Sequence, residues 1–311
     1  QKTLMRSWSG KCLAVRKVTQ DNQGKRTAGV DGLKNLSPNA RLTLVTRLKL
    51  TGKSKPTRRV WIDKPGKAEK RPLGIPTMKD RALQALVKLA LEPEWEAKFE
   101  GNSFGFRPGR STHDAIGAIF NSVSKKAKYV LDADISQCFD RIDHNALLKK
   151  LNTFPSLRQQ IKSWLKSGVM DKGVFSDTDK GTPQGGVISP LLANIALHGF
   201  EEHITSFKVY GKRGTRPSIT RYADDFVILH ESEEHIKFLR QKADEWLKGM
   251  GLELKPSKTH VCHTSEGFDF LGFNIRQYPV GAYRAASNPH GGILGFKTII
   301  KPTKEAVKRH L

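Results

Sequence analysis

The sequence is poor in cysteine and contains no long apolar run. Its three cysteines, Cys12, Cys138 and Cys262, have no paired spacing, which argues against a disulfide scaffold and favours a reducing compartment. No stretch approaches the roughly 20 apolar residues that a membrane-spanning helix needs, and no signal peptide, internal repeat or low-complexity segment is recognisable. We therefore expect a globular protein of a reducing compartment.

Acidic residues are scarce relative to basic ones. The chain has 311 residues with 54 Lys and Arg against 30 Asp and Glu, which gives a formal net charge of +24. Such an excess needs a polyanionic partner, and nucleic acid is the commonest one because each neutralised phosphate releases counterions. Residues 41–81 hold 13 basic and 3 acidic side chains and are predicted to form β-hairpins and loops. A merely solvated charged face is the alternative for this stretch.

Helix-like and strand-like periodicities alternate along the chain. Apolar residues recur at helical spacing in residues 80–99, where we expect Pro93 to interrupt the helix, and after a capping box at Ser111–Asp114. Other elements are expected as follows: helices from about Asp143, over 155–166, from 189–190 and over 236–250, and strands over 129–135, 218–229 and 268–275. This order predicts an α+β architecture in which an antiparallel sheet is backed by helices.

Carboxylates lie on two of the predicted strand segments. Asp132 and Asp134 are two positions apart and therefore share one side of their strand. Asp224 and Asp225 lie between apolar residues at a predicted hairpin turn, where adjacent like charges are costly unless a cation compensates them. Because carboxylates are preferred ligands of magnesium, Asp134 and this pair are predicted to hold two ions about 4 Å apart for phosphoryl transfer. A turn in solvent is the competing interpretation.

The segments around these acids resemble those of reverse transcriptases, and in particular those of group II intron reverse transcriptases, also called maturases. The box Tyr222-Ala223-Asp224-Asp225 resembles the active-site box of that family. The other matching segments follow in chain order: AGVDG (28–32), KRPLGIP (70–76), SFGFRPGRS (103–111), DISQCFD (134–140), GTPQGGVISP (181–190), LKPSKT (254–259) and FLGF (270–273). One such box is a weak signal, whereas this ordered set, from about residue 25 onward, is specific.

This resemblance implies the fingers and palm of a right-hand polymerase, with the thumb largely absent. Residues 1–125 would form an N-terminal extension and the fingers with some palm helix, 126–295 the palm with a finger-associated segment at about 145–190, and 296–311 the start of the thumb or maturase domain. The chain opens at Gln1 and stops within a basic, helix-like stretch, so we expect a fragment of a longer protein.

The resemblance also implies a location in the bacterial cytoplasm or in an organelle, an activity, and its partners. The activity is RNA-directed DNA polymerisation, in which dNTPs are added to a primer 3′-hydroxyl by two-metal phosphoryl transfer. The partners are an RNA template, intron RNA, a DNA primer or target, and dNTPs. Binding of the intron RNA would aid splicing and retrohoming. The expected cofactor is a pair of Mg²⁺ ions, with Mn²⁺ as a substitute.

Site residues follow from the same resemblance. Asp134, Asp224 and Asp225 would be catalytic metal ligands, with the carbonyl of Ile135 as a backbone ligand. Asp132 would support these ligands, and Asp140 would cap the following helix.

A nucleotide pocket is implied as well. Arg71 matches the residue that clamps the triphosphate, where a planar guanidinium makes several hydrogen bonds. Phe139 matches the bulky residue beneath the sugar that excludes a 2′-hydroxyl, with a core phenylalanine as the alternative. The remaining predicted contacts are Lys64 on the triphosphate (Lys67 and Lys70 being alternatives), Gln184 on the incoming nucleotide, and Lys258 near the pyrophosphate, for proton transfer or for electrostatic support alone.

Further residues are matched to the nucleic-acid strands. Phe270, Leu271 and Gly272 resemble the primer grip, and Arg107 and Arg110 are expected along the template RNA. Trp61 could stack on a base, although a core position is the better prediction.

Other interpretations remain at this point. An RNA-binding splicing cofactor with a vestigial polymerase is one, and a reverse transcriptase of a retron, a diversity-generating element or a CRISPR-linked gene is another. A zinc site at His260, Cys262 and His263 is disfavoured because a second ligand pair at regular spacing is missing.

Overall fold

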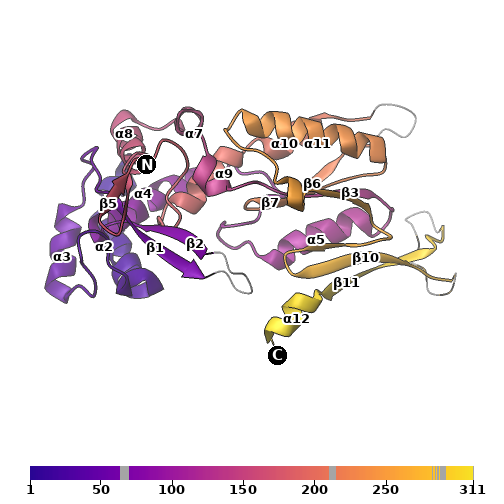
Figure 1. Ribbon diagram of the computed structural model, residues 1–311, viewed down its shortest axis with the longest axis horizontal. Helices are drawn as coiled ribbons and strands as arrows, with labels where there is room; N and C mark the ends of the chain where they lie inside the picture. Colours follow the sequence, from indigo (N-terminus) through magenta and orange to yellow (C-terminus); the bar gives the residue numbers. More distant parts are fainter. Residues whose placement is uncertain are drawn as a thin grey trace. The chain divides into compact units, whose positions relative to one another are not determined.

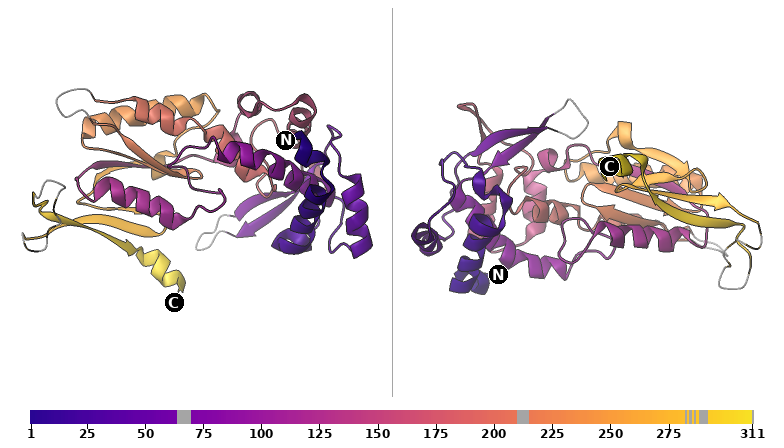
Figure 2. Two further views of the ribbon diagram at one scale, coloured as in Figure 1. Left: turned by 180° about the vertical axis from the view of Figure 1, so that it is seen from behind. Right: turned by 90° about the horizontal axis from the view of Figure 1, so that it is seen from below.

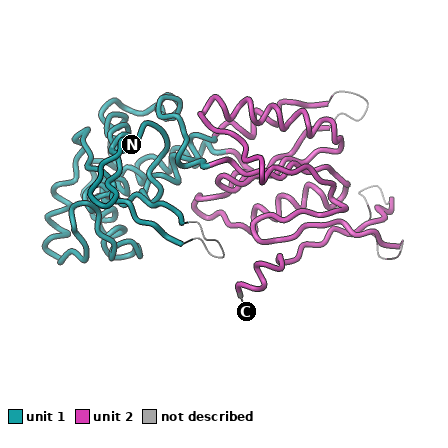
Figure 3. Tube along the Cα trace, viewed as in Figure 1, with its two compact units in different colours: residues 1–99, 137–197 teal, residues 100–136, 198–311 magenta. Residues whose placement is uncertain are grey.

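The computed structural model describes residues 1–63, 70–209, 215–281, 283, 285, 287 and 292–310. The chain forms two compact units, and each is assembled from two stretches of sequence (Figure 3): residues 1–99 with 137–197, and residues 100–136 with 198–311. These boundaries differ from the predicted division at residues 125 and 295. The assignment of the units to fingers, palm and thumb stays a prediction.

The first unit begins with a group of short helices: α1 (Lys2–Arg6), α2 (Trp8–Arg16), the π-helical turn η1 (Lys17–Asp21), the 3₁₀ turn η2 (Gln23–Arg26) and α3 (Pro38–Arg47). The side chain of Ser37 caps α3 by accepting a hydrogen bond from the Ala40 N–H, and Pro38 occupies the first turn. Helix α2 packs against both α3 and α4 (Met78–Glu96).

Two sequence-based expectations fail in this region. Residues 41–47 belong to α3, not to a hairpin or loop, because the capped start at Ser37 and Pro38 directs them into a helix. Pro93 does not interrupt the helix in 80–99, since α4 continues to Glu96. A proline near the last turn removes a single backbone hydrogen bond, and buried residues on α4 such as Leu91 and Trp95 hold that end in place.

A four-stranded sheet lies in the same unit, in the order β2-β1-β4-β5. Strands β1 (Thr57–Asp63) and β2 (Lys70–Ile75) form the predicted antiparallel hairpin, with Ile62 opposite Arg71. Strand β1 pairs in parallel with β4 (Val169–Asp171), which forms a hairpin with β5 (Val174–Ser176). The remaining helices of the unit are α6 (Cys138–Arg141), α7 (His144–Leu151), α8 (Pro155–Leu165) and α9 (Ser189–Leu197).

The second unit is built on an antiparallel sheet with the order β6-β7-β3-β8. Its strands are β6 (Ser218–Tyr222), β7 (Asp225–His230), β3 (Tyr129–Asp134) and β8 (His260–His263). Helices α10 (Phe200–Ser206) and α11 (Glu233–Lys248) lie on one side of this sheet and α5 (Thr112–Val123) on the other (Figure 1). The antiparallel sheet backed by helices is therefore present as predicted.

The two faces of this sheet follow from the two-residue period of its strands. Phe226 packs edge-on against Phe200 of α10, with ring centroids 5.1 Å apart, so Phe226 faces α10. On the opposite face, Val130, Val227 and Leu229 join a buried cluster with residues of α5. Asp134 and Asp225 have the same strand parity as these residues, so the apolar cluster and the acids share one face of the sheet.

A second, three-stranded sheet has the order β11-β10-β9. Its strands are β9 (Phe268–Phe270), β10 (Phe273–Pro279) and β11 (Phe296–Pro302), and Figure 2 shows β10 and β11 running side by side. Phe268, Phe270 and Ile275 belong to the same buried cluster as α5. The short helix α12 (Lys304–His310) follows, and the 3₁₀ turn η3 (Pro256–Lys258) precedes β8. Within the described part of the chain, no helix is both long enough and apolar enough to span a bilayer.

Candidate active site

Strand pairing in the second unit brings the predicted catalytic acids together. In the β3–β7 ladder Asp134 lies directly opposite Asp225. Asp224 is the residue before Asp225, and its carbonyl accepts a hydrogen bond from the Ile135 N–H at 3.2 Å. Side chains opposite each other in an antiparallel pair have Cβ atoms roughly 5 Å apart. Residues far apart in the sequence therefore place their carboxylates side by side at the end of the sheet.

The turn that carries Asp224 is tight and strained. Tyr222 pairs with Asp225, so Ala223 and Asp224 are the only residues of the β6–β7 loop. Ala223 has a φ of 59°, in the left-handed region where a side chain costs roughly 1–2 kcal/mol. Glycine is favoured at such a position in two-residue hairpins. Surrounding contacts must therefore hold the turn in this conformation.

The electrostatics of the acids call for a cation. Burial, followed by the charges of Asp224 and Asp134, raises the pKa of Asp225 from 3.8 to about 7. Burial likewise raises the pKa of Asp132 to about 6. Like charges directly opposite each other destabilise a sheet. A positive charge bound here would relieve this repulsion and keep Asp225 ionised at neutral pH.

Lys258 supplies one such positive charge. Its Nζ lies 2.5 Å from Oδ2 of Asp134, and this hydrogen bond raises the pKa of Lys258 above its ordinary value. The backbone supports the contact, because the Lys255 N–H donates to the Asp134 carbonyl at 2.8 Å. Lys258 thus lies beside the acids. Its proposed contact with pyrophosphate stays a prediction.

These residues fit magnesium in kind but are not a complete ligand set. Across residues 1–63, 70–209, 215–281 and 292–310, no three His, Cys, Asp or Glu side chains form a group that could hold a metal ion as they stand. Magnesium commonly takes one or two protein carboxylates and completes its shell with water and substrate phosphates. Asp134, Asp224, Asp225 and the Ile135 carbonyl therefore remain predicted ligands, with Lys258 on one of their oxygens.

Residues predicted to touch the nucleotide form a second cluster, within the first unit. Gln184 donates from Nε2 to Oδ2 of Asp140 at 2.7 Å, and its carbonyl accepts from the Gly74 N–H at 2.6 Å. The Thr182 N–H donates to the Phe139 carbonyl at 2.5 Å. The loop 181–186 is thereby fastened both to α6 and to β2. Phe139 is partly buried and Asp140 exposed.

The prediction for Asp140 is wrong. The side chain that caps α7 is that of Asp143, which accepts a hydrogen bond from the Ala146 N–H at 2.7 Å. Asp140 lies in α6 and binds Gln184 instead. Sequence spacing alone could not separate these roles, since both aspartates precede α7 and the partner of Asp140 is 44 residues away.

Two of the remaining residues predicted to contact the nucleotide, Lys70 and Arg71, lie on β2. Arg71 is exposed on β2 opposite Ile62. Lys70 forms an exposed ion pair with Asp63 at 3.5 Å. Lys64 and Lys67 lie outside the described residues. Contacts of Arg71 and Lys64 with a triphosphate stay predictions.

The predicted primer grip is a hairpin turn. Phe270 pairs with Phe273, so Leu271 and Gly272 form a two-residue loop, and their φ values are 51° and 85°. Positive φ at both central positions is the signature of a type I′ turn. Phe270 is buried, and the Gly272 carbonyl accepts from the Thr303 N–H at 2.9 Å. Contact with a primer stays a prediction.

The predicted template residues differ in their surroundings. Arg107 is 7% exposed, and its NH1 group donates to the carbonyls of Ser103 and Glu100 at 2.5 and 2.7 Å. This burial argues against a contact with RNA and gives Arg107 a structural role. Arg110 is exposed and lies over the Phe104 ring at 5.7 Å, so it remains a predicted RNA contact.

The prediction that Trp61 is a core residue is wrong. It is 49% exposed, and its Nε1 donates to Asp171 at 3.2 Å. It lines a pocket of about 920 Å³ between β1, residues 26–34 and the β4–β5 turn. The pocket has a single carboxylate, that of Asp171. Its basic side chains are more numerous: Arg26, Lys34, Arg58, Arg59 and Lys172. We call it the basic pocket.

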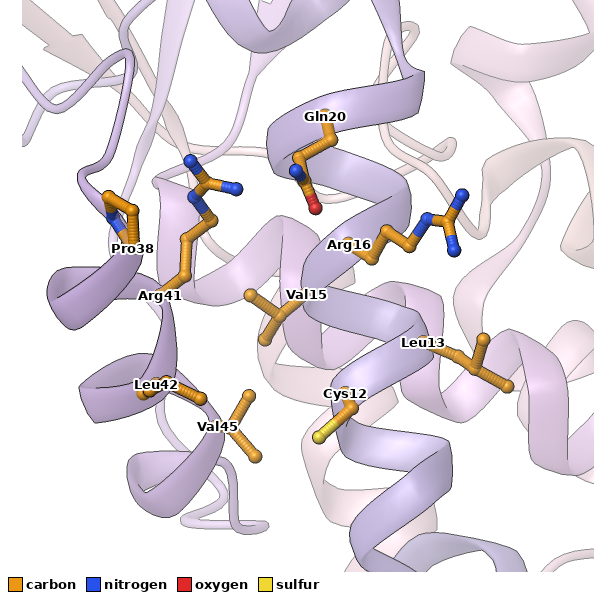
Figure 4. A pocket seen from close by; sticks show the side chains of 9 residues that line it. All are labelled: Cys12, Leu13, Val15, Arg16, Gln20, Pro38, Arg41, Leu42 and Val45. Carbon is orange, nitrogen blue, oxygen red and sulfur yellow. The ribbon is translucent and has the colours of Figure 1, made fainter.

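Another cavity, of about 470 Å³, lies between α2 and α3 (Figure 4). Val15, Leu42 and Val45 form apolar walls, and Arg16 and Arg41 are the charged side chains that line it. Reasoning from sequence found neither cavity, because each depends on how separate helices and loops pack. The adjacent arginines Arg58 and Arg59 were the sequence feature that could have indicated the basic pocket.

Comparison with known families agrees with the geometry of the acids. The family model for reverse transcriptase (RNA-dependent DNA polymerase) matches residues 62–275, more than half of the chain. The chain belongs to the reverse transcriptase family. A second model, for the N-terminal domain of reverse transcriptase, matches residues 1–48. The predicted enzyme class, RNA-directed DNA polymerase, is thereby confirmed.

Individual relatives place this reverse transcriptase near intron-encoded proteins. Protein YkfC of Escherichia coli K12 is 33% identical over 83% of this chain and 78% of that protein. The group II intron-encoded protein LtrA of Lactococcus lactis subsp. cremoris is 30% identical over 82% of this chain. The chain spans about half of LtrA, 53% of its length. These findings confirm the sequence-based identification with group II intron reverse transcriptases.

Solved structures agree at the level of the fold. The apo telomerase of Candida tropicalis, truncated from its C-terminal domain, superposes with a TM-score of 0.56 at 14% identity. The match covers 80% of this chain and 55% of that one. The predicted α+β polymerase fold is therefore confirmed.

Proposed function

We propose that this chain extends a DNA primer along an RNA template and that Asp134, Asp224 and Asp225 hold the magnesium ions for this reaction. The observation that carries the proposal is the register of β3 and β7, which sets Asp134 opposite Asp225 with Asp224 adjacent. The raised pKa of Asp225 supports it, because this carboxylate needs a nearby cation to ionise fully at pH 7. A turn without function would have no reason to gather partly buried like charges.

The metal would supply two effects when bound: a lower pKa for the primer 3′-hydroxyl and neutralisation of the leaving pyrophosphate. The protein's own part is to present oxygen ligands from a rigid sheet. Lys258 contributes a cation that contacts Asp134 at 2.5 Å. We propose that its ammonium leaves this oxygen when metal binds and then faces the phosphates of the nucleotide.

We propose that the nucleotide is selected by Arg71, Phe139 and Gln184, with Lys64 as a further phosphate contact. The ring of Phe139 would exclude a 2′-hydroxyl, and the side-chain amide of Gln184 would contact the incoming dNTP. The hydrogen bond from Gln184 to Asp140 supports this role, since it limits the positions that the amide can adopt. Primer contacts are proposed for the turn at Phe270, Leu271 and Gly272.

We propose that the polyanionic partners are template RNA and the RNA of a parent group II intron, whose splicing and retrohoming the full protein would assist. The net charge of +24 and the basic pocket support this proposal. Arg59 and Lys172 line that pocket, and Trp61 offers an exposed indole on which a base can stack. Arg110 remains a proposed contact to the template.

The decisive experiment is primer extension on poly(rA)/oligo(dT) with Mg²⁺, comparing the wild type with Asp224→Ala. Binding of a structured RNA is measured in parallel over a range of salt concentrations. The proposal expects extension by the wild type, none by Asp224→Ala, and equal RNA binding by both. RNA binding without extension by the wild type would instead indicate a splicing cofactor with a vestigial polymerase.

A further inference from the structure

A buried arginine lies directly behind the acidic turn. Arg221 is the fourth residue of β6 and is 3% exposed. Its NH1 group donates to the carbonyl of Ala223 at 3.0 Å, and its NH2 group donates to Oγ of Ser103 at 2.7 Å. A charged side chain is rarely buried unless it is paired and hydrogen-bonded, so this position needs a physical reason.

The backbone around Arg221 is fixed by the segment 102–105. The Arg221 N–H donates to the Asn102 carbonyl at 2.9 Å, and the Phe104 N–H donates to the Arg221 carbonyl at 2.9 Å. Asn102 is itself held by Glu201, which accepts from its side-chain amide at 2.7 Å. Because Arg221 is fixed at its backbone, its guanidinium has a defined position from which to reach Ala223.

The backbone of the turn is where this support acts. Ala223 has its φ in the left-handed region, which L-residues with a side chain rarely adopt. A Cβ at Gly105 would collide with the Ala223 nitrogen, so Gly105 allows the 102–105 segment to lie against the turn. The guanidinium holds the carbonyl on the other side of the same residue. Asp224 and Asp225 follow at once, so the orientation of Ala223 directs both.

We propose that Arg221 is a positioning residue for the reaction: by holding the Ala223 carbonyl it fixes the turn and thereby aims the carboxylates of Asp224 and Asp225. This inference rests on the proposed function, in which those carboxylates bind magnesium. Arg221 touches neither substrate nor metal. Ser103 holds the other half of the guanidinium, so it belongs to the same support.

The test compares Arg221→Lys with a matched control, Arg81→Lys. Lysine keeps the charge but cannot reach both acceptors with a planar group. Arg81 is also a buried arginine (5% exposed) whose guanidinium binds backbone carbonyls, those of Pro76, Gly24 and Thr27, but it lies in the other unit. Both variants lose hydrogen bonds of a buried guanidinium, and only one loses support of the acidic turn.

Three experiments are made on each variant. They give the midpoint of thermal unfolding, Mn²⁺ binding in the absence of substrate by electron paramagnetic resonance, and the steady-state kinetics (kcat and KM) of single-nucleotide extension as Mg²⁺ is varied. Misplacement of a catalytic group by about 1 Å costs up to roughly 100-fold in rate. We expect Arg221→Lys to lower kcat by about 10- to 100-fold, to weaken Mn²⁺ binding and to raise the half-saturating Mg²⁺ concentration several-fold, with little change in KM for primer–template.

Arg81→Lys is expected to lower the unfolding midpoint without changing either metal measurement. Equal metal binding and equal Mg²⁺ dependence in Arg221→Lys and the wild type would overturn the inference. If Arg221→Lys shows no cooperative unfolding, Ser103→Ala takes its place. We then expect about a two- to threefold rise in half-saturating Mg²⁺, a smaller effect than for Arg221→Lys because the hydrogen bond from Arg221 to the Ala223 carbonyl is kept. An unchanged half-saturating Mg²⁺ concentration in Ser103→Ala would also overturn the inference.

The proposed function fails separately from this inference. If Asp224→Ala extends primers as well as the wild type, the acids are not the metal ligands, and the proposed function is wrong. If Asp224→Ala is inactive while Arg221→Lys binds metal normally, only the role of Arg221 is wrong.

Discussion

The acidic turn of the second unit and the Gln184 loop of the first unit are held in place in different ways. Asp134 and Asp225 owe their positions to a ladder of backbone pairs between β3 and β7. Gln184 owes the position of its amide to one side-chain hydrogen bond with Asp140. Backbone pairing is cooperative and survives the loss of a side chain, whereas a single contact does not. The acidic side chains can therefore be removed without moving the strands that carry them. The amide of Gln184, by contrast, can be displaced by a mutation of Asp140 alone.

The largest expected effect tests the acidic turn. Asp225→Ala should reduce primer extension by roughly 10³-fold or more, because loss of a metal ligand removes several kcal/mol of transition-state stabilisation. Circular dichroism and RNA binding should stay unchanged. Asp244→Ala on α11 removes a partly exposed aspartate paired with Lys248 and is the matched control, expected to keep full activity. Substantial primer extension by Asp225→Ala would show that the acidic turn does not supply an essential metal ligand.

Phe139 gives the next effect, on nucleotide choice. Phe139→Ala should let rNTPs compete, lowering the preference for dNTPs by about 10- to 200-fold, the range expected when a steric contact is lost from a pocket. The measurement is kcat/KM for dTTP and UTP on the same primer–template. Phe120→Ala, another partly exposed phenylalanine, on α5, should leave the preference as it is. If Phe139→Ala also leaves the preference for dNTPs unchanged, Phe139 is an ordinary packing residue.

A third prediction concerns Asp140 and tests whether its hydrogen bond positions the amide of Gln184. Asp140→Ala should lower kcat/KM for dNTPs by roughly tenfold, the size of one hydrogen bond to a charged acceptor. Asp140→Asn keeps an oxygen acceptor and should lose less. In a double-mutant cycle with Gln184→Ala the two losses should not add, because both act through one contact. Additive losses would show that Asp140 does not act through Gln184.

The smallest effect concerns the pH dependence of stability without metal. The pKa of Asp225 is raised from 3.8 to about 7 in the folded chain, so the folded state binds this proton more tightly than the unfolded state does. Its contribution to stability is fully present below pH 3.8 and is lost as the pH rises through 7. The unfolding midpoint should fall by a few degrees over this window.

Two comparisons check the pH prediction. Asp225→Asn should flatten this dependence, since an amide does not titrate. Magnesium should raise the unfolding midpoint more at pH 8 than at pH 5, because protons compete for the carboxylate. A midpoint that is independent of pH in the wild type would contradict the raised pKa.

Much of the fold could be predicted from local patterns. The capping box at Ser111 and Asp114, the buried strand at 129–134 and the hairpin around Ala223 all appear where periodicity and turn chemistry indicate them. Local errors arose where a capping signal or a tertiary contact outweighed composition. Residues 41–47 form a helix because of the cap at Ser37, and Arg107 turned inward to bind carbonyls.

The sequence by itself determined which carboxylates lie on strands, that Asp132 and Asp134 share one side of their strand, and to which family the chain belongs. Only the tertiary structure decided that Asp134 stands opposite Asp225, that Gln184 is held by Asp140, and that Arg221 lies behind the acidic turn. The reason is physical: local periodicity depends on neighbours along the chain. Strand register, buried ion placement and long-range hydrogen bonds depend on which distant segments pack together.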